Sequence, residues 1–115
     1  TLSGGSDMAR YFMLANVTRE YASARMKNLD EDRIPVIKKL CESLGVTFHS
    51  LDFTRGIYDI IGIVDAPDFE TINALKCVVV ESGVVAQMDI LETIDIDVIL
   101  RKAVEATGSY SKPGE

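Results

Sequence analysis

The apolar residues of this chain fall into strand-length runs separated by stretches with helical spacing. Residues 11–17 form a nearly continuous apolar run, which predicts a strand well inside a sheet. Residues 46–54 alternate between apolar and polar but change phase over residues 49–51, where a β-bulge is expected. Two further strands are predicted over residues 58–65, paired with the preceding strand as an antiparallel hairpin, and over residues 84–94. One face of the last strand is expected to carry Val84, Ala86, Met88 and Ile90.

Apolar residues three or four positions apart predict two helices between these strands. The first is expected to begin after the N-cap residue Asp32 and to end at Gly45. The second is expected to begin after Asp68 and to close near Gly83. Residues 18–29 are polar and weakly patterned, so they predict a loop or a separate short helix.

The predicted order is strand, helix, strand, strand, helix, strand, with a last amphipathic helix over residues 98–106 capped by Asp95 or Asp97. This is the α+β arrangement called ferredoxin-like. Its two main helices cover one face of the sheet and leave the other face without a partner. A second copy of the chain is the simplest cover, so we expect a homodimer or a multiple of dimers.

The chain length fits a single domain. The 115 residues suffice for one hydrophobic core and leave no material for a second. We expect residues 8–107 to form that domain. Residues 1–7 are small and polar and resemble a tag remnant or a disordered tail, and residues 108–115 are expected to fray.

Charge and hydropathy exclude two classes of partner. Twelve Lys and Arg against eighteen Asp and Glu give a net charge of −6, without the basic stripe that nucleic-acid binding requires. The apolar runs are much shorter than the about 20 residues of a membrane span. We therefore expect neither a nucleic-acid nor a membrane partner.

Cysteine and histidine are too few for a metal cluster. Cys41 and Cys77 lie far apart without a CxxC motif, and His49 is the single histidine, so we expect no metal and no cofactor. Both cysteines fall in predicted helices and nothing resembles a secretory signal. We expect free, packed thiols in a reducing, cytoplasmic compartment.

The hairpin turn carries the most specific string in the chain. Gly56 supplies the backbone freedom of a tight turn, and Tyr58 and Asp59 follow it at the start of a strand. A phenol and a carboxylate at a loop edge are able to take part in chemistry. The structural alternative, which we favour, is that Tyr58 fills a dimer seam and Asp59 accepts hydrogen bonds from backbone amides.

The residues 56–59, Gly-Ile-Tyr-Asp, match the Gly-x-Tyr-Asp signature of the GYD-domain family, which this chain resembles from about residue 11 to residue 100. Residues 14–18 and 64–68 are similar to the flanking segments of that family in the same order. The resemblance implies a ferredoxin-like chain that pairs into a dimeric α/β barrel, in a family without an established activity. Residues 85–89 are apolar and acidic where that family usually continues in a basic or threonine-rich strand, which argues against a shared anion-binding role.

Two functional hypotheses follow. The first is a homo-oligomeric binding or assembly module whose cavity holds a small, mostly apolar ligand. Its candidate lining residues are Tyr11, Met13, Phe48, His49, Tyr58 and Met88. Arg25 and Lys27 form the one local positive cluster and with Arg55 are candidates for steering an anion, although ordinary solvated surface is the favoured explanation.

The second hypothesis is a cofactor-independent enzyme, by analogy with monooxygenases and isomerases built on dimeric α/β barrels. His49 would act as acid or base, because its ordinary pKa lies near neutrality, and Tyr58 or Asp59 would orient it. The two hypotheses differ in one testable respect, namely whether these three side chains converge on one concavity.

Overall fold

In a computed structural model of the protein, which describes residues 8–115, a four-stranded antiparallel sheet forms the centre. The predicted tail over residues 1–7 lies outside the described residues. The strands lie in the order β2-β3-β1-β4. They are β1 (Ala9–Val17), β2 (Thr47–Phe53), β3 (Ile60–Ala66) and β4 (Val85–Glu92).

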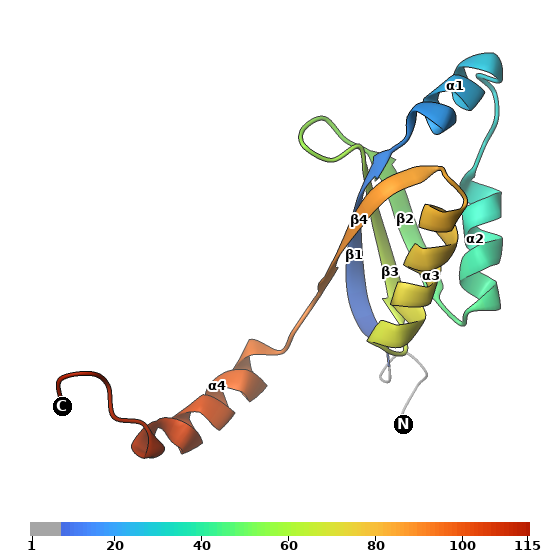
Figure 1. Cartoon of the computed structure of the whole chain (residues 1–115). Coiled ribbons are helices and arrows are strands. Elements are labelled where there is room, and N and C mark those ends of the chain that lie inside the picture. Colours follow the sequence, from blue (N-terminus) through green and yellow to red (C-terminus); the bar gives the residue numbers. More distant parts are fainter. Residues whose placement is uncertain (1–7) are drawn as a thin grey trace.

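Two helices, α2 (Ile34–Ser43) and α3 (Phe69–Glu81), lie side by side on one face of the sheet (Figure 1). This arrangement confirms the predicted ferredoxin-like α+β fold. The other face of the sheet carries no layer of secondary structure among the described residues, and we call it the open face.

Alternation along β1 decides which side chains enter the core. Tyr11 and Met13 point toward the helices and are opposite Val64 and Gly62 of β3 in the strand register. Tyr11 is 1% exposed and Val64 is fully buried. The buried residues of the core are Tyr11, Met13, Ala15, Cys41, Val46, Val64, Ala66, Ile72, Leu75 and Met88.

The polar stretch before α2 forms a separate short helix, α1 (Arg19–Lys27), which is one of the two predicted alternatives. Thr18 is its N-cap, because the Thr18 hydroxyl accepts a hydrogen bond from the Tyr21 amide at 3.1 Å. The same hydroxyl lies 2.5 Å from the Gly83 carbonyl oxygen, and the Thr18 amide donates to the Val84 carbonyl at 3.1 Å. These contacts attach α1 to the loop between α3 and β4.

The strand boundaries correct two sequence predictions. β3 begins at Ile60, so Tyr58 and Asp59 lie in the preceding loop and not in the strand. The expected shared face of β4 is wrong at Ala86, which is exposed, because the register with β1 shifts at Asn16 and Val17. The register shift between Phe48 and Ser50 confirms the β-bulge predicted in β2.

The helix caps agree with the sequence at two of three helices. Asp68 caps α3 and accepts from the Thr71 amide at 2.8 Å. Asp95 caps the last helix, α4 (Ile96–Ala106), which starts two residues earlier than predicted. The N-cap position of α2 is Arg33 instead of Asp32, although the Asp32 carboxylate still accepts from the Ile34 amide at 3.0 Å. Pro35 lies in the first turn of α2, where its missing N–H is tolerated.

α4 extends away from the sheet and its two helices (Figure 1). No residue of α4 is buried, although the helix is amphipathic. A short 3-10 helix, η2 (Thr107–Ser109), follows it. The Cα radius of gyration is 18.7 Å, whereas a compact chain of this length has about 13 Å. Within the described residues, no helix combines the length and the apolar character needed to cross a membrane.

Candidate functional site

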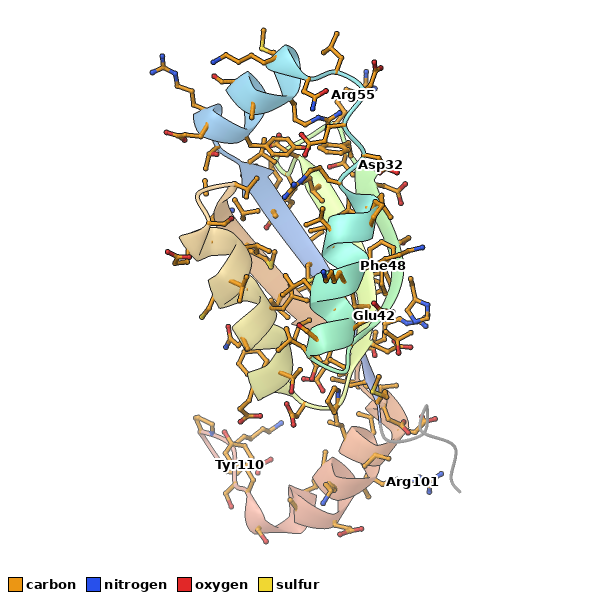
Figure 2. The ribbon with its side chains drawn as sticks, turned by 90° about the vertical axis from the view of Figure 1, so that its right-hand side faces the viewer. Asp32, Glu42, Phe48, Arg55, Arg101 and Tyr110 are labelled. Carbon is orange, nitrogen blue, oxygen red and sulfur yellow. The ribbon has the colours of Figure 1, made fainter. Side chains whose placement is uncertain are left out.

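A cavity of about 540 Å³ lies between the sheet and the pair of helices α2 and α3. In Figure 2, β1 is visible in the space between these two helices. Ile37 and Leu40 border the cavity from α2, and Leu75 and Val79 border it from α3. The two α2 residues lie on one face of their helix, and so do the two α3 residues, because residues three or four positions apart share a helix face. Both faces are directed toward the sheet. The sheet contributes Met13, Ala15, Val17, Leu51, Phe53, Ile60, Gly62, Val85 and Met88.

Small residues on the central strands leave part of this space empty. Ala15 of β1 and Gly62 of β3 both line the cavity. A Cβ atom at Gly62 would lie 3.2 Å from the Met13 Cε atom. The missing side chain of Gly62 therefore leaves room for the end of the Met13 side chain beside β3. Close-packed protein interiors contain few voids larger than a water molecule. A cavity of this volume falls within the range of small-molecule sites.

The polar residues of the cavity gather at the end near α1. Tyr21 and Arg25 come from α1, while Glu31, Asp32 and Arg33 come from the segment that leads into α2. The rest of the lining is apolar apart from Ser82. The cavity therefore has an apolar body and one polar end.

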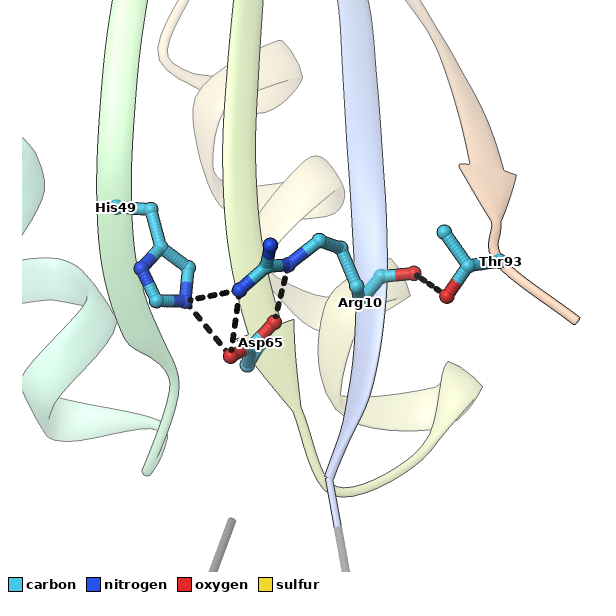
Figure 3. A network of polar contacts seen from close by, with 4 residues as sticks. All are labelled: Arg10, His49, Asp65 and Thr93. Atoms are coloured by element: carbon cyan, nitrogen blue, oxygen red, sulfur yellow. Dashed lines mark hydrogen bonds and ion pairs between the residues drawn. The ribbon is translucent and has the colours of Figure 1, made fainter. Parts of the chain in front are cut away.

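A separate polar cluster lies on the open face of the sheet, at the start of β1 (Figure 3). The Arg10 Nε donates to Asp65 Oδ1 at 3.0 Å, and His49 Nε2 lies 2.7 Å from Asp65 Oδ2. Each of the three residues comes from a different strand. The hydrogen bond from Arg10 lowers the pKa of Asp65, with a smaller contribution from His49.

A second set of polar contacts lies at the other end of β1. The Tyr58 hydroxyl donates to Asp89 Oδ2 at 2.6 Å, and this hydrogen bond raises the pKa of Tyr58. The Asp59 carboxylate accepts from the Val17 amide at 2.9 Å. Asn16 is within 3.5 Å of that carboxylate and also donates to the Ile57 carbonyl at 2.9 Å. These bonds hold the β2–β3 loop against the end of β1.

The structure does not bring the candidate catalytic residues together within one chain. His49 lies beside Arg10, whereas Asp59 lies beside Asn16. These two β1 residues are six positions apart, which corresponds to about 20 Å along an extended strand. His49, Tyr58 and Asp59 are also absent from the cavity lining.

Of the six candidate lining residues, Met13 and Met88 line the cavity. Tyr11 lies in the core, and Phe48 packs against the core beneath the Lys38 ammonium, 5.7 Å from its ring centroid. Arg55 is exposed in the loop between β2 and β3.

Most of the cavity lining was not predicted from the sequence, because all six candidate lining residues came from predicted strands. The helix-face residues of α2 and α3 carried a usable signal in their spacing, but that pattern also fits an ordinary core.

Among the described residues, no group of three or more His, Cys, Asp or Glu could hold a metal ion. Both cysteines are free, and Cys77 is exposed, so the expectation that both thiols are packed is wrong for Cys77. Burial raises the pKa of the Cys41 thiol, which keeps it protonated and poorly reactive.

A known protein family matches most of this chain. The family model described as GYD domain matches residues 11–102, which is most of the chain. The chain belongs to the GYD domain family. The match includes the Gly56-Ile57-Tyr58-Asp59 turn, β1 from Tyr11 onward, the other three strands and α4 as far as Lys102. No curated protein and no solved structure matches this GYD domain.

Proposed function

We propose that this GYD domain is a self-associating module that binds a small, mostly apolar molecule in the cavity between the sheet, α2 and α3. The observation that carries the proposal is the cavity of about 540 Å³ with its apolar body. Burying an apolar ligand there removes both its surface and that of the lining from water, at about 25 cal/mol per Å². Met13 and Met88 add flexible side chains that adapt to different ligand shapes.

The cavity is tested by titrating the full chain with 1-octanol in a calorimeter. The proposal expects saturable binding of one molecule per chain and a rise in the thermal unfolding midpoint with octanol concentration, since ligand binds only the folded state. Val79→Phe fills the cavity from α3 and should weaken octanol binding about tenfold, which corresponds to a loss of ~1.4 kcal/mol.

A matched control lies one residue further along α3. Val80 is 36% exposed and is not part of the cavity lining, so Val80→Phe adds the same ring outside the cavity. Octanol affinity should be unchanged in this variant. Equal affinity of both variants and the unsubstituted protein, or no binding at all, would reject the cavity as a ligand site.

Self-association is the second part of the proposal. The open face carries the half-buried apolar side chains of Phe12, Leu14, Ile61 and Ile63 at its centre. Leu91 on the same face is 53% exposed. A second copy placed face to face would bury these residues and form the dimeric α/β barrel. Native mass spectrometry of the full chain would report a dimer or a multiple of dimers, whereas a monomer at micromolar concentration would contradict this part of the proposal.

The alternative of a cofactor-independent enzyme has less support. His49 would be its acid or base, but its Nε2 atom is engaged by Asp65 at 2.7 Å and by Arg10 at 3.1 Å on the open face. His49 does not line the cavity between the sheet, α2 and α3. A cytoplasmic location is also part of the proposal, because the exposed free thiol of Cys77 suits a reducing compartment.

A further inference from the structure

The polar end of the cavity contains two carboxylates and two guanidinium groups. Glu31 and Arg33 neutralise each other, since Arg33 Nη1 lies 3.2 Å from Glu31 Oε2. The Asp32 carboxylate accepts from the Ile34 amide at the beginning of α2. Ser82 is also engaged, because its hydroxyl donates to the Val79 carbonyl at 2.7 Å and accepts from the Val84 amide at 3.3 Å.

Arg25 is the exception at this end of the cavity. Its side chain makes one hydrogen bond within the described residues, from Nη1 to the Tyr21 hydroxyl at 3.0 Å. Its Nε atom is buried and has no hydrogen-bond partner there, the one such side-chain atom among the described residues. No carboxylate of the described residues forms an ion pair with Arg25. A buried donor without a partner costs free energy until an acceptor satisfies it.

The position of Arg25 is set by its neighbours. The guanidinium carbon lies 5.9 Å from the centroid of the Tyr21 ring. Tyr21 in turn stacks on Phe53 of β2, with ring centroids 6.4 Å apart and an interplanar angle of 23°. Phe53 is itself a lining residue, so this stack connects α1 to the sheet at the polar end of the cavity.

We infer that the ligand of this cavity is an apolar molecule that ends in a carboxylate, and that Arg25 binds the carboxylate. This inference rests on the proposed function and deepens it. The Tyr21 hydroxyl occupies Nη1, which leaves the edge formed by Nε and Nη2 for a ligand. That edge presents two parallel N–H groups, which match the two oxygens of a carboxylate. The apolar part of the ligand then lies along Leu40, Met13 and Met88.

The test compares three ligands with the same eight-carbon chain, namely octanoate, 1-octanol and octylammonium. We expect octanoate to bind the full chain about tenfold more tightly than 1-octanol, because a hydrogen bond to a charged group stabilises more than a neutral one. Octylammonium should bind more weakly than either, because its charge repels the guanidinium. Arg25→Gln should remove the preference for octanoate, so that octanoate and 1-octanol bind this variant with similar affinity.

The control variant is Arg19→Gln, which makes the same change on the same helix. Arg19 is exposed and does not line the cavity, so the preference for octanoate should persist. Equal affinities of the unsubstituted protein for octanoate and 1-octanol would overturn the inference and leave the proposed cavity intact. An octanoate preference that survives Arg25→Gln would overturn the role of Arg25. No binding of any of the three ligands would reject the proposed function itself.

Discussion

Asp65 joins three strands at one end of the open face. Its carboxylate accepts from Arg10 Nε at 3.0 Å and lies 2.7 Å from His49 Nε2. Arg10 Nη2 and His49 Nε2 are themselves only 3.1 Å apart, so the proton on His49 decides their contact. When Nε2 carries the proton, it donates to Asp65, and the carboxylate then accepts hydrogen bonds from both Arg10 and His49. The cluster links β2, at the edge of the sheet, to β3 and β1. His49 Nε2 is occupied by Asp65 and Arg10 within it.

The first prediction concerns the charge of Asp65. Its pKa is lowered in the folded protein by Arg10 and then His49, so folding favours the charged carboxylate. This contribution is present above the unfolded pKa of about 3.9 and is lost as the pH falls through the lower folded value. The difference in unfolding free energy between the unsubstituted protein and Asp65→Asn should therefore shrink as urea denaturation is repeated from neutral pH to below about pH 4.

The matched control is Asp52→Asn on β2. Asp52 is exposed and its carboxylate forms no hydrogen bond or ion pair among the described residues, so this substitution should leave the unfolding free energy nearly unchanged at neutral pH. A difference for Asp65→Asn that stays constant with pH would contradict the assigned ion pair.

The second prediction concerns the backbone of Gly56. Its φ is +144°, a conformation that residues with a Cβ rarely adopt, and an added Cβ would meet no atom within 4 Å. Gly56→Ala should therefore lower the unfolding free energy by about 1–3 kcal/mol through backbone strain alone. Gly108 has neither a positive φ nor a close neighbour, so Gly108→Ala should have little effect in the same urea titration. Equal stabilities of the two variants would show that the turn relaxes.

At the scale of elements, α1 owes its place to a few contacts at its ends. None of its residues is buried, so packing contributes little to its stability. Thr18 caps the helix and contacts the Gly83 carbonyl, while Tyr21 stacks on Phe53. α2 and α3 differ, because each presents an apolar face that the sheet covers. α1 is therefore the element of the cavity most easily displaced.

The third prediction tests the attachment of α1. Thr18→Ala removes the cap and the hydroxyl contact with Gly83, and should lower the unfolding free energy by about 1 kcal/mol. Amide hydrogens of α1 should exchange faster in this variant, measured by mass spectrometry, while those of α3 stay protected. Thr18→Ser keeps the hydroxyl and should retain most of the protection. Unchanged exchange in Thr18→Ala would mean that the Tyr21–Phe53 stack alone holds α1.

At the scale of the whole molecule, two regions carry groups of uncovered apolar side chains that share one surface. One is the centre of the open face, and the other is α4, where Ile96 and Leu100 are each 52% exposed and Val104 is 74% exposed. The dimensions of 65 × 42 × 23 Å reflect the extension of α4 from the domain. A monomer would keep both surfaces in water, at a free-energy cost that self-association reduces.

The fourth prediction concerns α4 in the proposed assembly. Ile96, Ile99, Leu100 and Val104 share one side of the helix, and Val98 lies on the opposite side near Arg101 and Glu105. If α4 packs on a second copy of the chain, Leu100→Asp should shift the protein toward smaller species by sedimentation velocity. Val98→Asp adds the same charge on the polar side and should leave the assembly unchanged. Equal sedimentation of both variants would exclude α4 from the interface.

The sequence by itself determined the features that depend on near neighbours in the chain. The order of the four strands and of α2, α3 and α4, the Asp68 cap, the β-bulge at His49 and the turn at Gly56 follow from periodicity and backbone preference over a few residues. Its match to the GYD turn likewise pointed to the family and thus to the fold. The sequence did not predict that β3 begins only after Tyr58 and Asp59, or that Ala86 is exposed. Register across the sheet decides both features.

Only the tertiary structure decided which side chains meet. His49 is a neighbour of Asp65 and Arg10 instead of Tyr58 and Asp59, because strand register carries the two groups to opposite ends of β1. The cavity depends on how α2 and α3 rest on a floor that contains Ala15 and Gly62, which no single segment specifies. Arg25 differs from the other charged residues at the polar end, because its Nε has no hydrogen-bond partner among the described residues, whereas Glu31 and Arg33 form an ion pair. Such placements result from many weak contacts between residues distant in sequence, and hydrophobic spacing along one segment does not encode them.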